Sequence, residues 1–587
     1  KHELAEIMTL ESGKPLQESL GEVEYGNAFV EWFAEEGKRA YGETIPSNNT
    51  LRIVTIKQAV GVVGAITPWN FPLAIFTGEV VAALAAGNTV VAKPAEQTSL
   101  IASYAVSLMH QAGVPSEALQ LVLGAGETGA ALTQDPRISG VIFTGSTEVA
   151  RLINQTLAKR DDNPVLIAET GGQNAMIVDS TALAEQVCAD VLNSAFDSAG
   201  QRCSALRILC VQEDVADHMI EMIKGAMNEL VVGNPQLLNT DVGPVIDAEA
   251  QTNLLAHIDK MKGTAKSFHE IKVSDGIDDA QSTFVAPILF ELNNLNELQR
   301  EVFGPVLHVV RYRADELDSL IDQINSKGYA LTHGVHSRID ATVDHIRKRI
   351  EAGNVYINRN IVGAVVGVQP FGGHGLSGTG PKAGGSFYLQ RLSRLKQWAA
   401  PTLSKVGQAD DGVLKRLEAV LHNLPISQEC KLSIAAALGQ ARIRTLRHAE
   451  SVLAGPTGER NVLSWHAPKR VWIYGGDLVQ SFTALVQLAA AGVQGVIEAN
   501  HPLAAEVTHL GNLLIVDKPE NAGISHVVAL EDLPSERKQA LAATDGALIR
   551  ILPSENGLDI LQVFEEISCS INTTAAGGNA SLMAMSD

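Results

Sequence analysis

The chain has 587 residues with 45% hydrophobic and 19% charged side chains, which indicates a globular protein of several domains with a substantial core. Its 45 basic and 66 acidic residues give a formal charge of −21, and the acids are spread along the chain, so a nucleic acid is not expected as a partner. Five cysteines without a CxxC pair argue against a disulfide framework or a zinc site and favour a reducing compartment, with the cytoplasm as the expected location.

The first residues predict helix rather than a targeting signal. Residues 1–39 show a charged helical pattern with neither an initiator Met nor the apolar segment of a signal peptide, and we interpret the chain as a fragment of a longer polypeptide. Later apolar stretches are interrupted well before the roughly 20 residues needed to cross a bilayer, so no transmembrane helix is predicted.

Short β-rich runs then alternate with helical segments, which predicts an α/β protein with mostly parallel sheets. The runs are "LRIVTI", "GVVGAI", "NTVVAKP", "LQLVLG", "ISGVIFTGS", "PVLIAE" and "AMIVD". Residues 300–390 are rich in Gly and Pro, as is typical of loops around a site. A boundary is expected near "WAAPTLSKVGQADDG", followed by helix over 415–450 and a renewed α/β pattern from 470.

Polar residues with chemical potential follow several of these strands. Asn70 in "TPWNFP" follows "GVVGAI", where its amide can donate to a developing oxyanion. Lys93 and Glu96 in "VVAKPAEQ" are placed to hold a ribose or phosphate and to accept from ribose hydroxyls. Gly145 and Ser146 open a helix after a strand, where backbone N–H groups and the helix dipole favour a pyrophosphate.

A carboxylate and a thiol complete the set. Glu169 ends the strand in "LIAETGGQN", and Cys203 follows in "GQRC". In isolation, a buried Cys is more often a packing residue than a nucleophile, and Asn70 could simply cap a turn. Lys93, Glu169 and Glu301 could likewise be surface groups. Only their order along the chain favours a catalytic interpretation.

This ordered set, completed by Glu301 in "EVFGP", resembles the aldehyde dehydrogenase superfamily over about residues 1–400. Two departures are mild: "ETGG" replaces the commoner Glu-Leu-Gly-Gly, and Ala150 stands where many members have the last Gly of the dinucleotide loop. The "GAGETG" match at 124–129 is interpreted as a tight turn or an adenosine contact, because a lone GxGxxG is weak.

The resemblance implies roles for these residues. Cys203 is the nucleophile, Asn70 the oxyanion donor and Glu169 the base that activates water for thioester hydrolysis. The cofactor is NAD. The residues implied to bind it are Lys93, Glu96, Gly145, Ser146, Glu301, Phe303, Thr67, Pro68 and Trp69.

The resemblance also implies a domain order. We expect an NAD-binding domain of Rossmann type over 1–175, with 42–60 in a β flap used for homo-oligomer formation, and a catalytic α/β domain over 176–360. Site loops and the return to the flap take 361–400, a linker with helix takes 401–469, and a degenerate Rossmann-like domain takes 470–587.

Substrate preference is indicated by Ser204, next to the nucleophile, and by the backbone N–H groups of Gly363 and Ala364, which can hold a carboxylate. These residues, with "GAVVGVQPFGG" and "SGTGPKAGG", resemble the L-glutamate-γ-semialdehyde (1-pyrroline-5-carboxylate) dehydrogenases of proline catabolism. With the C-terminal extension, the chain is similar to the dehydrogenase half of bifunctional proline utilisation proteins. That implies a FAD-dependent proline dehydrogenase half upstream in the parent polypeptide.

Other functions were weighed against this one. A dehydrogenase for another short carboxylated semialdehyde, such as succinate semialdehyde, is the nearest alternative. A coenzyme A-acylating enzyme needs no base such as Glu169, an inactive scaffold need not keep Cys203 or Asn70, and a thiol hydrolase needs a His partner that no motif supplies.

The C-terminal region contains a partial internal repeat. "VQLAAAGVQGVIEANHPLA" at 486–504 is similar to 81–99, and "TTAAGGNASLM" at 573–583 is similar to 168–177. In this alignment Glu498 lies opposite Lys93 and Ala575 opposite Glu169, so both functional groups are lost. We therefore expect a domain that binds no NAD and packs against the dehydrogenase or a neighbouring subunit.

Overall fold

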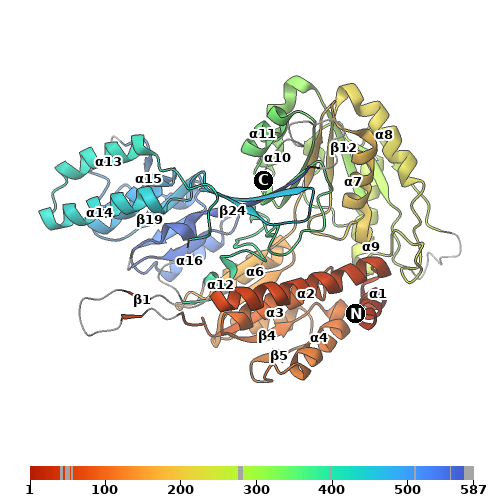
Figure 1. Cartoon of the computed structure of the whole chain (residues 1–587), viewed down its shortest axis with the longest axis horizontal. Coiled ribbons are helices and arrows are strands. Elements are labelled where there is room, and N and C mark those ends of the chain that lie inside the picture. The colour runs from red at the N-terminus through yellow and green to blue at the C-terminus, as the bar shows by residue number, and fades with distance from the viewer. Residues whose placement is uncertain are drawn as a thin grey trace.

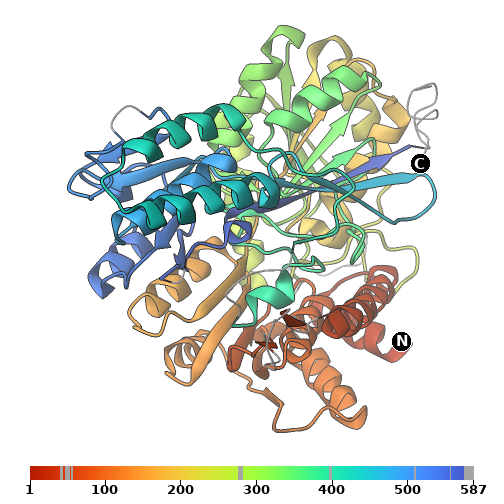
Figure 2. The same ribbon diagram turned by 60° about the vertical axis from the view of Figure 1, so that its left-hand side comes forward.

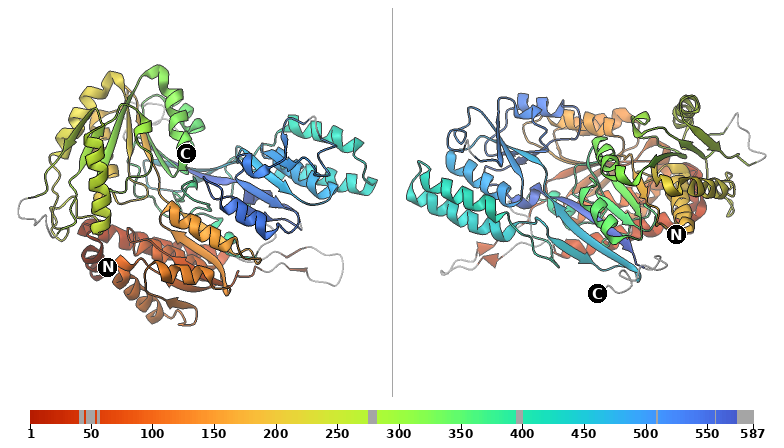
Figure 3. Two further views of the ribbon diagram at one scale, coloured as in Figure 1. Left: turned by 180° about the vertical axis from the view of Figure 1, so that it is seen from behind. Right: turned by 90° about the horizontal axis from the view of Figure 1, so that it is seen from above.

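Three large β-sheets organise the computed structural model, which describes residues 1–39, 44–45, 53–54, 57–274, 282–394, 400–507, 510–555 and 557–573. Figures 1 and 2 show the N-terminal part in red and orange below the yellow and green part, with the cyan and blue C-terminal part to one side. Both views in Figure 3 show this third part against the other two. Within the described residues no helix is long and apolar enough to cross a membrane.

The first sheet is parallel with five strands in the order β5-β4-β3-β6-β7. Its strands are β3 (Val62–Ile66), β4 (Thr89–Lys93), β5 (Leu119–Leu121), β6 (Ile138–Thr144) and β7 (Val165–Glu169). The helices are α1 (His2–Ser12), α2 (Leu16–Arg39), α3 (Ala74–Ala85), α4 (Ser99–Gln111), α5 (Gly126–Gln134) and α6 (Thr147–Leu157). The strands are short apolar runs buried between helices, as parallel sheets require, and α2 packs along α3.

The second sheet has ten strands in the order β10-β11-β12-β9-β8-β14-β15-β24-β18-β17. Its first strands are β8 (Ala175–Val178), β9 (Ile208–Gln212), β10 (Ser267–Glu270), β11 (Ile288–Glu291), β12 (Val306–Tyr312), β14 (Thr332–His336) and β15 (Asn354–Ile357). The helices are α7 (Ala184–Phe196), α8 (Glu213–Met227), α9 (Ala248–Lys262), α10 (Leu317–Ser326) and α11 (Asp340–Arg349). A small antiparallel pair, β13 (Tyr329–Ala330) with β16 (His374–Gly375), and α12 (Tyr388–Arg391) lie in the loop region.

The last strands of this sheet come from the C-terminal part of the chain, which differs from the expected boundary at 470. β17 (Glu450–Leu453) and β18 (Glu459–His466) lie in the stretch expected to be linker and helix, and β24 (Glu565–Asn572) lies in the stretch expected to be a separate domain. β24 pairs parallel with β15 and antiparallel with β18. Local pattern identifies a strand but not the sheet that it joins, so sequence reasoning could not place β24.

The third sheet is parallel, in the order β21-β20-β19-β22-β23, the same order as the first. Its strands are β19 (Arg470–Tyr474), β20 (Gln494–Glu498), β21 (Leu513–Val516), β22 (His526–Ala529) and β23 (Arg550–Pro553). The helices are α13 (Asp411–Asn423), α14 (Gln428–Arg444), α15 (Leu478–Ala490) and α16 (Ser535–Ala542). The predicted α/β class is confirmed, since parallel strand pairs dominate all three sheets.

Part of the expected flap lies in the described residues. β1 (Thr44–Ile45) and β2 (Ile53–Val54) form an antiparallel pair. The rest of the expected flap up to residue 56, the stretch 395–399 of its return, and the repeat segment from residue 574 lie outside the described residues.

Candidate active site

A cavity of about 930 Å³ lies between the first two sheets and gathers most of the predicted site residues. Its walls contain Cys203, Ser204, Glu169, Asn70, Pro68, Trp69, Gly145, Ser146, Glu301, Phe303, Gly363 and Ala364. These residues come from distant parts of the chain, so their convergence is the principal structural finding about the site.

Cys203 lies in a turn held by backbone constraints. Ser198, Ala199 and Gly200 have consecutive φ values of 54°, 55° and 66°, in the left-handed region that non-glycine residues rarely adopt. A Cβ on Gly200 would lie 2.1 Å from the Gly304 carbonyl oxygen, so this position requires glycine. Asn174 donates its side-chain amide to the Cys203 carbonyl at 2.6 Å and fixes the other end of the turn.

The thiol is protonated at neutral pH in this environment. The pKa of Cys203 is raised to about 12, mainly by burial and also by the carboxylates of Glu301 and Glu169, while a hydrogen bond from the Ser204 backbone and the charge of Arg207 act in the opposite direction. Nucleophilic attack therefore requires that a proton leaves Cys203 first.

Glu169 is a buried carboxyl at the carboxyl end of β7. Its Oε2 accepts from the Gly373 N–H at 3.0 Å, while its buried Oε1 has no hydrogen-bond partner among the described residues. Burial raises the pKa of Glu169 to about 8; the Gly373 hydrogen bond and Lys382 lower it, and Glu79 raises it. A carboxyl with this pKa is suited to general-base catalysis near neutral pH.

Asn70 is held by residues that sequence reasoning missed. Lys14 donates to the Asn70 carbonyl oxygen at 2.8 Å and forms a buried ion pair with Glu22. The Glu22 carboxylate also accepts from the backbone N–H groups of Leu73 and Ala74, at 2.9 and 3.0 Å, beside the start of α3. The partners are far apart in sequence, so no local pattern indicates them.

Glu301 and Phe303 lie beside a buried arginine. Arg207 donates to Glu301 at 3.2 Å, and its guanidinium lies 5.1 Å from the Phe303 ring centroid. The Trp69 ring meets Phe303 edge-on, with centroids 5.6 Å apart. Burial raises the pKa of Glu301 and Arg207 opposes that shift. These contacts orient two of the residues expected to bind NAD.

The start of α6 has the features that a pyrophosphate needs. Ser146 is the N-cap of this helix and accepts from the Val149 N–H at 3.2 Å. A Cβ on Gly145 would lie 2.5 Å from the Phe143 ring, so only glycine fits there. Both residues line the cavity, and a helix N-terminus attracts an anion.

Lys93, Glu96 and Thr67 meet at the end of β4, outside the cavity wall as the described residues define it. Lys93 Nζ lies 3.8 Å from Glu96 Oε2, and the Thr67 N–H donates to the Lys93 carbonyl at 3.1 Å. A Cβ on Gly129 would lie 3.6 Å from the Lys93 side chain, which places the end of the 124–129 motif beside this lysine. The three residues expected at the adenosine ribose thus lie close together, with the Glu96 side chain exposed.

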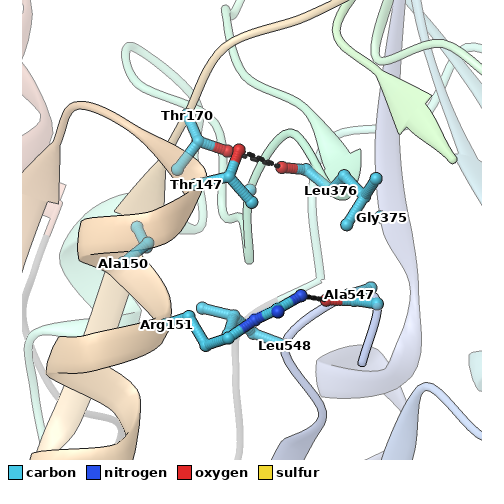
Figure 4. Close-up of a pocket in the computed structure, with 11 residues that line it drawn as sticks. Thr147, Ala150, Arg151, Thr170, Gly375, Leu376, Ala547 and Leu548 are labelled. Atoms are coloured by element: carbon cyan, nitrogen blue, oxygen red, sulfur yellow. Dashed lines mark hydrogen bonds between the residues drawn. The ribbon is translucent and has the colours of Figure 1, made fainter. Parts of the chain in front are cut away.

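A second pocket joins α6 to the C-terminal part of the chain (Figure 4). Arg151 donates to the Gly546 carbonyl at 3.2 Å and pairs with Asp545 at 3.2 Å. On the other side, Thr170 donates to the Leu376 carbonyl at 2.6 Å. The C-terminal part therefore touches the helix expected to bind the cofactor.

The profile of the aldehyde dehydrogenase family matches residues 1–398. The chain belongs to the aldehyde dehydrogenase family. The predicted aldehyde dehydrogenase fold is confirmed by solved structures. One is that of a Bradyrhizobium japonicum proline utilization A (PutA) mutant, D778Y, with 54% identity over 66% of this chain and 40% of that chain and a TM-score of 0.64.

Two groups of relatives of this aldehyde dehydrogenase are informative. The bifunctional protein PutA of Salmonella typhimurium is 44% identical over 99% of the chain and 45% of its own length. A 1-pyrroline-5-carboxylate dehydrogenase of Geobacillus sp. is 36% identical over 66% of the chain and 76% of its own length. The chain thus spans less than half the length of the PutA relatives. The resemblance stated from the sequence is confirmed.

No cluster of three or more His, Cys, Asp or Glu side chains in the described part of this dehydrogenase is arranged to hold a metal ion. The cavity wall contains a thiol, an amide and carboxyls that can take part in chemistry. A thiol beside an amide donor and a buried base can form an acyl-enzyme with an aldehyde and hydrolyse it.

Proposed function

We propose that this chain oxidises L-glutamate γ-semialdehyde, formed from 1-pyrroline-5-carboxylate, to L-glutamate, the second step of proline catabolism. The observation that carries the proposal is the meeting of Cys203, Glu169 and Asn70 in one cavity whose wall also contains Ser204 and Gly363. The names of the PutA and 1-pyrroline-5-carboxylate dehydrogenase relatives support the same substrate.

The chemistry follows from these side chains. The Cys203 proton is released to solvent as the sulfur attacks the aldehyde carbon, and the Asn70 amide and the Cys203 backbone N–H stabilise the oxyanion. NAD held by these residues would supply the hydride acceptor for this oxidation. Glu169 then takes a proton from water, which attacks the Cys203 thioester and releases the carboxylate product.

The substrate carboxylate is held at the far end of the cavity. Gly363 has a φ of 72°, and a Cβ there would meet no heavy atom within 4 Å, so its backbone faces open space. Its N–H and that of Ala364, with the Ser204 hydroxyl, supply the donors for a carboxylate.

NAD is the proposed cofactor. Lys93, Glu96 and Thr67 would hold the adenosine ribose region, Gly145 and Ser146 the pyrophosphate, and Pro68, Trp69, Glu301 and Phe303 the nicotinamide end. A related Escherichia coli structure, 35% identical with a TM-score of 0.61 over 67% of this chain and 80% of that chain, is described as an NADP-dependent enzyme. The preference therefore depends on Glu96, whose charge opposes a 2′-phosphate.

The setting of the enzyme follows from its relatives and cysteines. We place the chain in a cytoplasmic homo-oligomer and in a parent polypeptide whose other part is a FAD-dependent proline dehydrogenase. All five cysteines are free thiols in the structure, as a reducing compartment allows.

Steady-state rates with NAD and a set of aldehydes test the function. Glutamate semialdehyde should give the highest kcat/KM, above succinate semialdehyde and above an aldehyde of equal length without a carboxylate. Equal turnover of the uncharged aldehyde would contradict the carboxylate site, and a higher kcat/KM for succinate semialdehyde would favour the alternative substrate.

A further inference from the structure

A buried lysine organises the loop that binds the catalytic base. Lys382 is 3% exposed and donates from Nζ to Asn354 Oδ1 at 2.7 Å, to the Gly372 carbonyl at 3.0 Å and to the Pro370 carbonyl at 3.3 Å. The Gly353 carbonyl is a fourth acceptor. A neutral amine has two N–H donors and an ammonium three, so four acceptors around Nζ favour the ammonium form.

These contacts lead directly to Glu169. Gly372 is bound on both sides, because its carbonyl accepts from Lys382 and its N–H donates to Asn354 at 3.3 Å. The next residue, Gly373, donates the 3.0 Å hydrogen bond to the Glu169 carboxylate. A Cβ on Gly372 would lie 2.8 Å from Glu169 Oε1, so the turn also packs against the base.

The charge that faces Lys382 comes from the C-terminal end of the fold. Glu566 of β24 is 6% exposed, and its Oε2 accepts from the Lys382 backbone N–H at 3.2 Å. β24 reaches this position because it pairs with β15, which begins at Asn354, a ligand of the ammonium. The strand therefore brings a buried carboxylate to the loop that binds the base.

We propose that Glu566 and Lys382 are positioning residues for the general base, through which β24 fixes the Gly372–Gly373 turn and keeps Glu169 ionised during thioester hydrolysis. This inference rests on the proposed dehydrogenase function and assigns the C-terminal strand a part in its second chemical step.

The charges around these groups set the direction of the effect. Burial lowers the pKa of Lys382, and Glu566 and Glu169 oppose that shift by favouring its charged form. Burial likewise raises the pKa of Glu566, and Lys382 opposes that shift, so each group of the pair keeps the other ionised. Lys382 in turn lowers the pKa of Glu169, which burial and Glu79 raise. Removing the charge of Glu566 thus favours loss of the Lys382 proton and raises the pKa of Glu169 further.

The test is Glu566→Gln in the full chain, with NADH formation followed by stopped flow and in the steady state. The burst, which reports acylation at Cys203, should keep its amplitude, and KM for the aldehyde should change less than twofold. In the pH profile of steady-state turnover, the midpoint of the acid limb should rise by about one pH unit. Turnover at pH 7 should be about tenfold slower, because a rise of one unit in the pKa of Glu169 lowers its ionised fraction about tenfold.

Glu565→Gln is the matched control. It removes the same charge from the neighbouring residue of β24, whose carboxylate lies 3.8 Å from His374, and should leave the acid limb in place. An unchanged or lowered limb in Glu566→Gln would overturn the inference, as would an equal shift in Glu565→Gln.

A second variant separates positioning from folding. If Glu566 acts through Lys382, Glu566→Gln should have little further effect on the acid limb in a Lys382→Met background that retains the burst. If the shifts of the acid limb caused by Glu566→Gln and Lys382→Met added up in the double variant, the inference would be contradicted. If Lys382→Met loses the burst, the shift of the acid limb in Glu566→Gln alone, compared with Glu565→Gln, decides whether the inference holds. A wild-type chain that forms no NADH from any semialdehyde would instead refute the proposed function.

Discussion

The ion pair between Lys14 and Glu22 offers the sharpest test of how the site is held. Both side chains are almost fully buried, with exposures of 4% and 1%, and together they bind the Asn70 carbonyl and the N–H groups of Leu73 and Ala74. Lys14→Met leaves a buried carboxylate without its counter-charge, a change that costs about 3–5 kcal/mol. The free energy of unfolding of the cofactor domain should fall by that amount.

Two measurements are made. Unfolding in denaturant is monitored through the loss of the NADH burst, and the rate of the burst is measured without denaturant. The double variant Lys14→Met/Glu22→Gln removes both charges and should regain part of the lost stability. The NADH burst should be slower than in the wild type in both the single and the double variant, because in both the Asn70 carbonyl lacks the Lys14 ammonium. If Lys14→Met lowered stability by less than about 1 kcal/mol, the usual scale of an exposed pair, the ion pair would not hold this loop.

Three further predictions concern the reaction, and a fourth the C-terminal domain. Cys203→Ala should abolish oxidation, whereas Glu169→Gln should keep the NADH burst and accumulate a trapped acyl-enzyme; absence of both would remove the deacylation role. The deacylation rate should be highest above pH 8 and fall as the pH drops through about 8, because the base must be ionised and burial raises the pKa of Glu169 to about 8. A deacylation rate that, in single-turnover experiments, falls only near pH 4.5 would contradict this. NAD should have a higher kcat/KM than NADP, and Glu96→Gln should narrow the difference; equal efficiencies in the wild type would rule out that role of Glu96. Residues 406–587 alone should show no micromolar affinity for NAD by calorimetry, and a chain truncated near 405 should lose stability and deacylation. Micromolar binding by the isolated piece, or a truncated enzyme with unchanged stability and activity, would refute the expectation that this domain binds no NAD and acts by packing against the dehydrogenase.

The groups proposed to react could be singled out in the sequence because each lies in a local motif. Cys203, Glu169 and Asn70 follow strands or tight turns, and their order along the chain distinguishes them from packing or surface residues. The structure brings them into one cavity. The α/β class could be predicted for a similar reason, since apolar runs and helical period are local signals.

The groups that hold the site could not be predicted, because their partners lie far apart in the chain. Lys14 contacts a carbonyl 56 residues away, and Lys382 contacts a glutamate 184 residues away. Each such contact depends on how the sheets and helices pack. Lys14 and Lys382 are unremarkable lysines in their local sequence, and only burial reveals them.

The C-terminal sheet explains why a repeat of the cofactor fold need not bind a cofactor. It has the strand order of the first sheet, and Glu498 ends β20 as Lys93 ends β4. Glu498 is already paired with Arg537 at 2.6 Å, and the same guanidinium lies 5.3 Å from the Trp472 ring centroid. The position that corresponds to Lys93 is thus taken by a carboxylate that forms an internal ion pair. This part of the chain contacts the rest of the fold through Asp545 and Gly546, which contact Arg151 of α6, and through β24, which pairs with β15 and brings Glu566 to the Lys382 backbone.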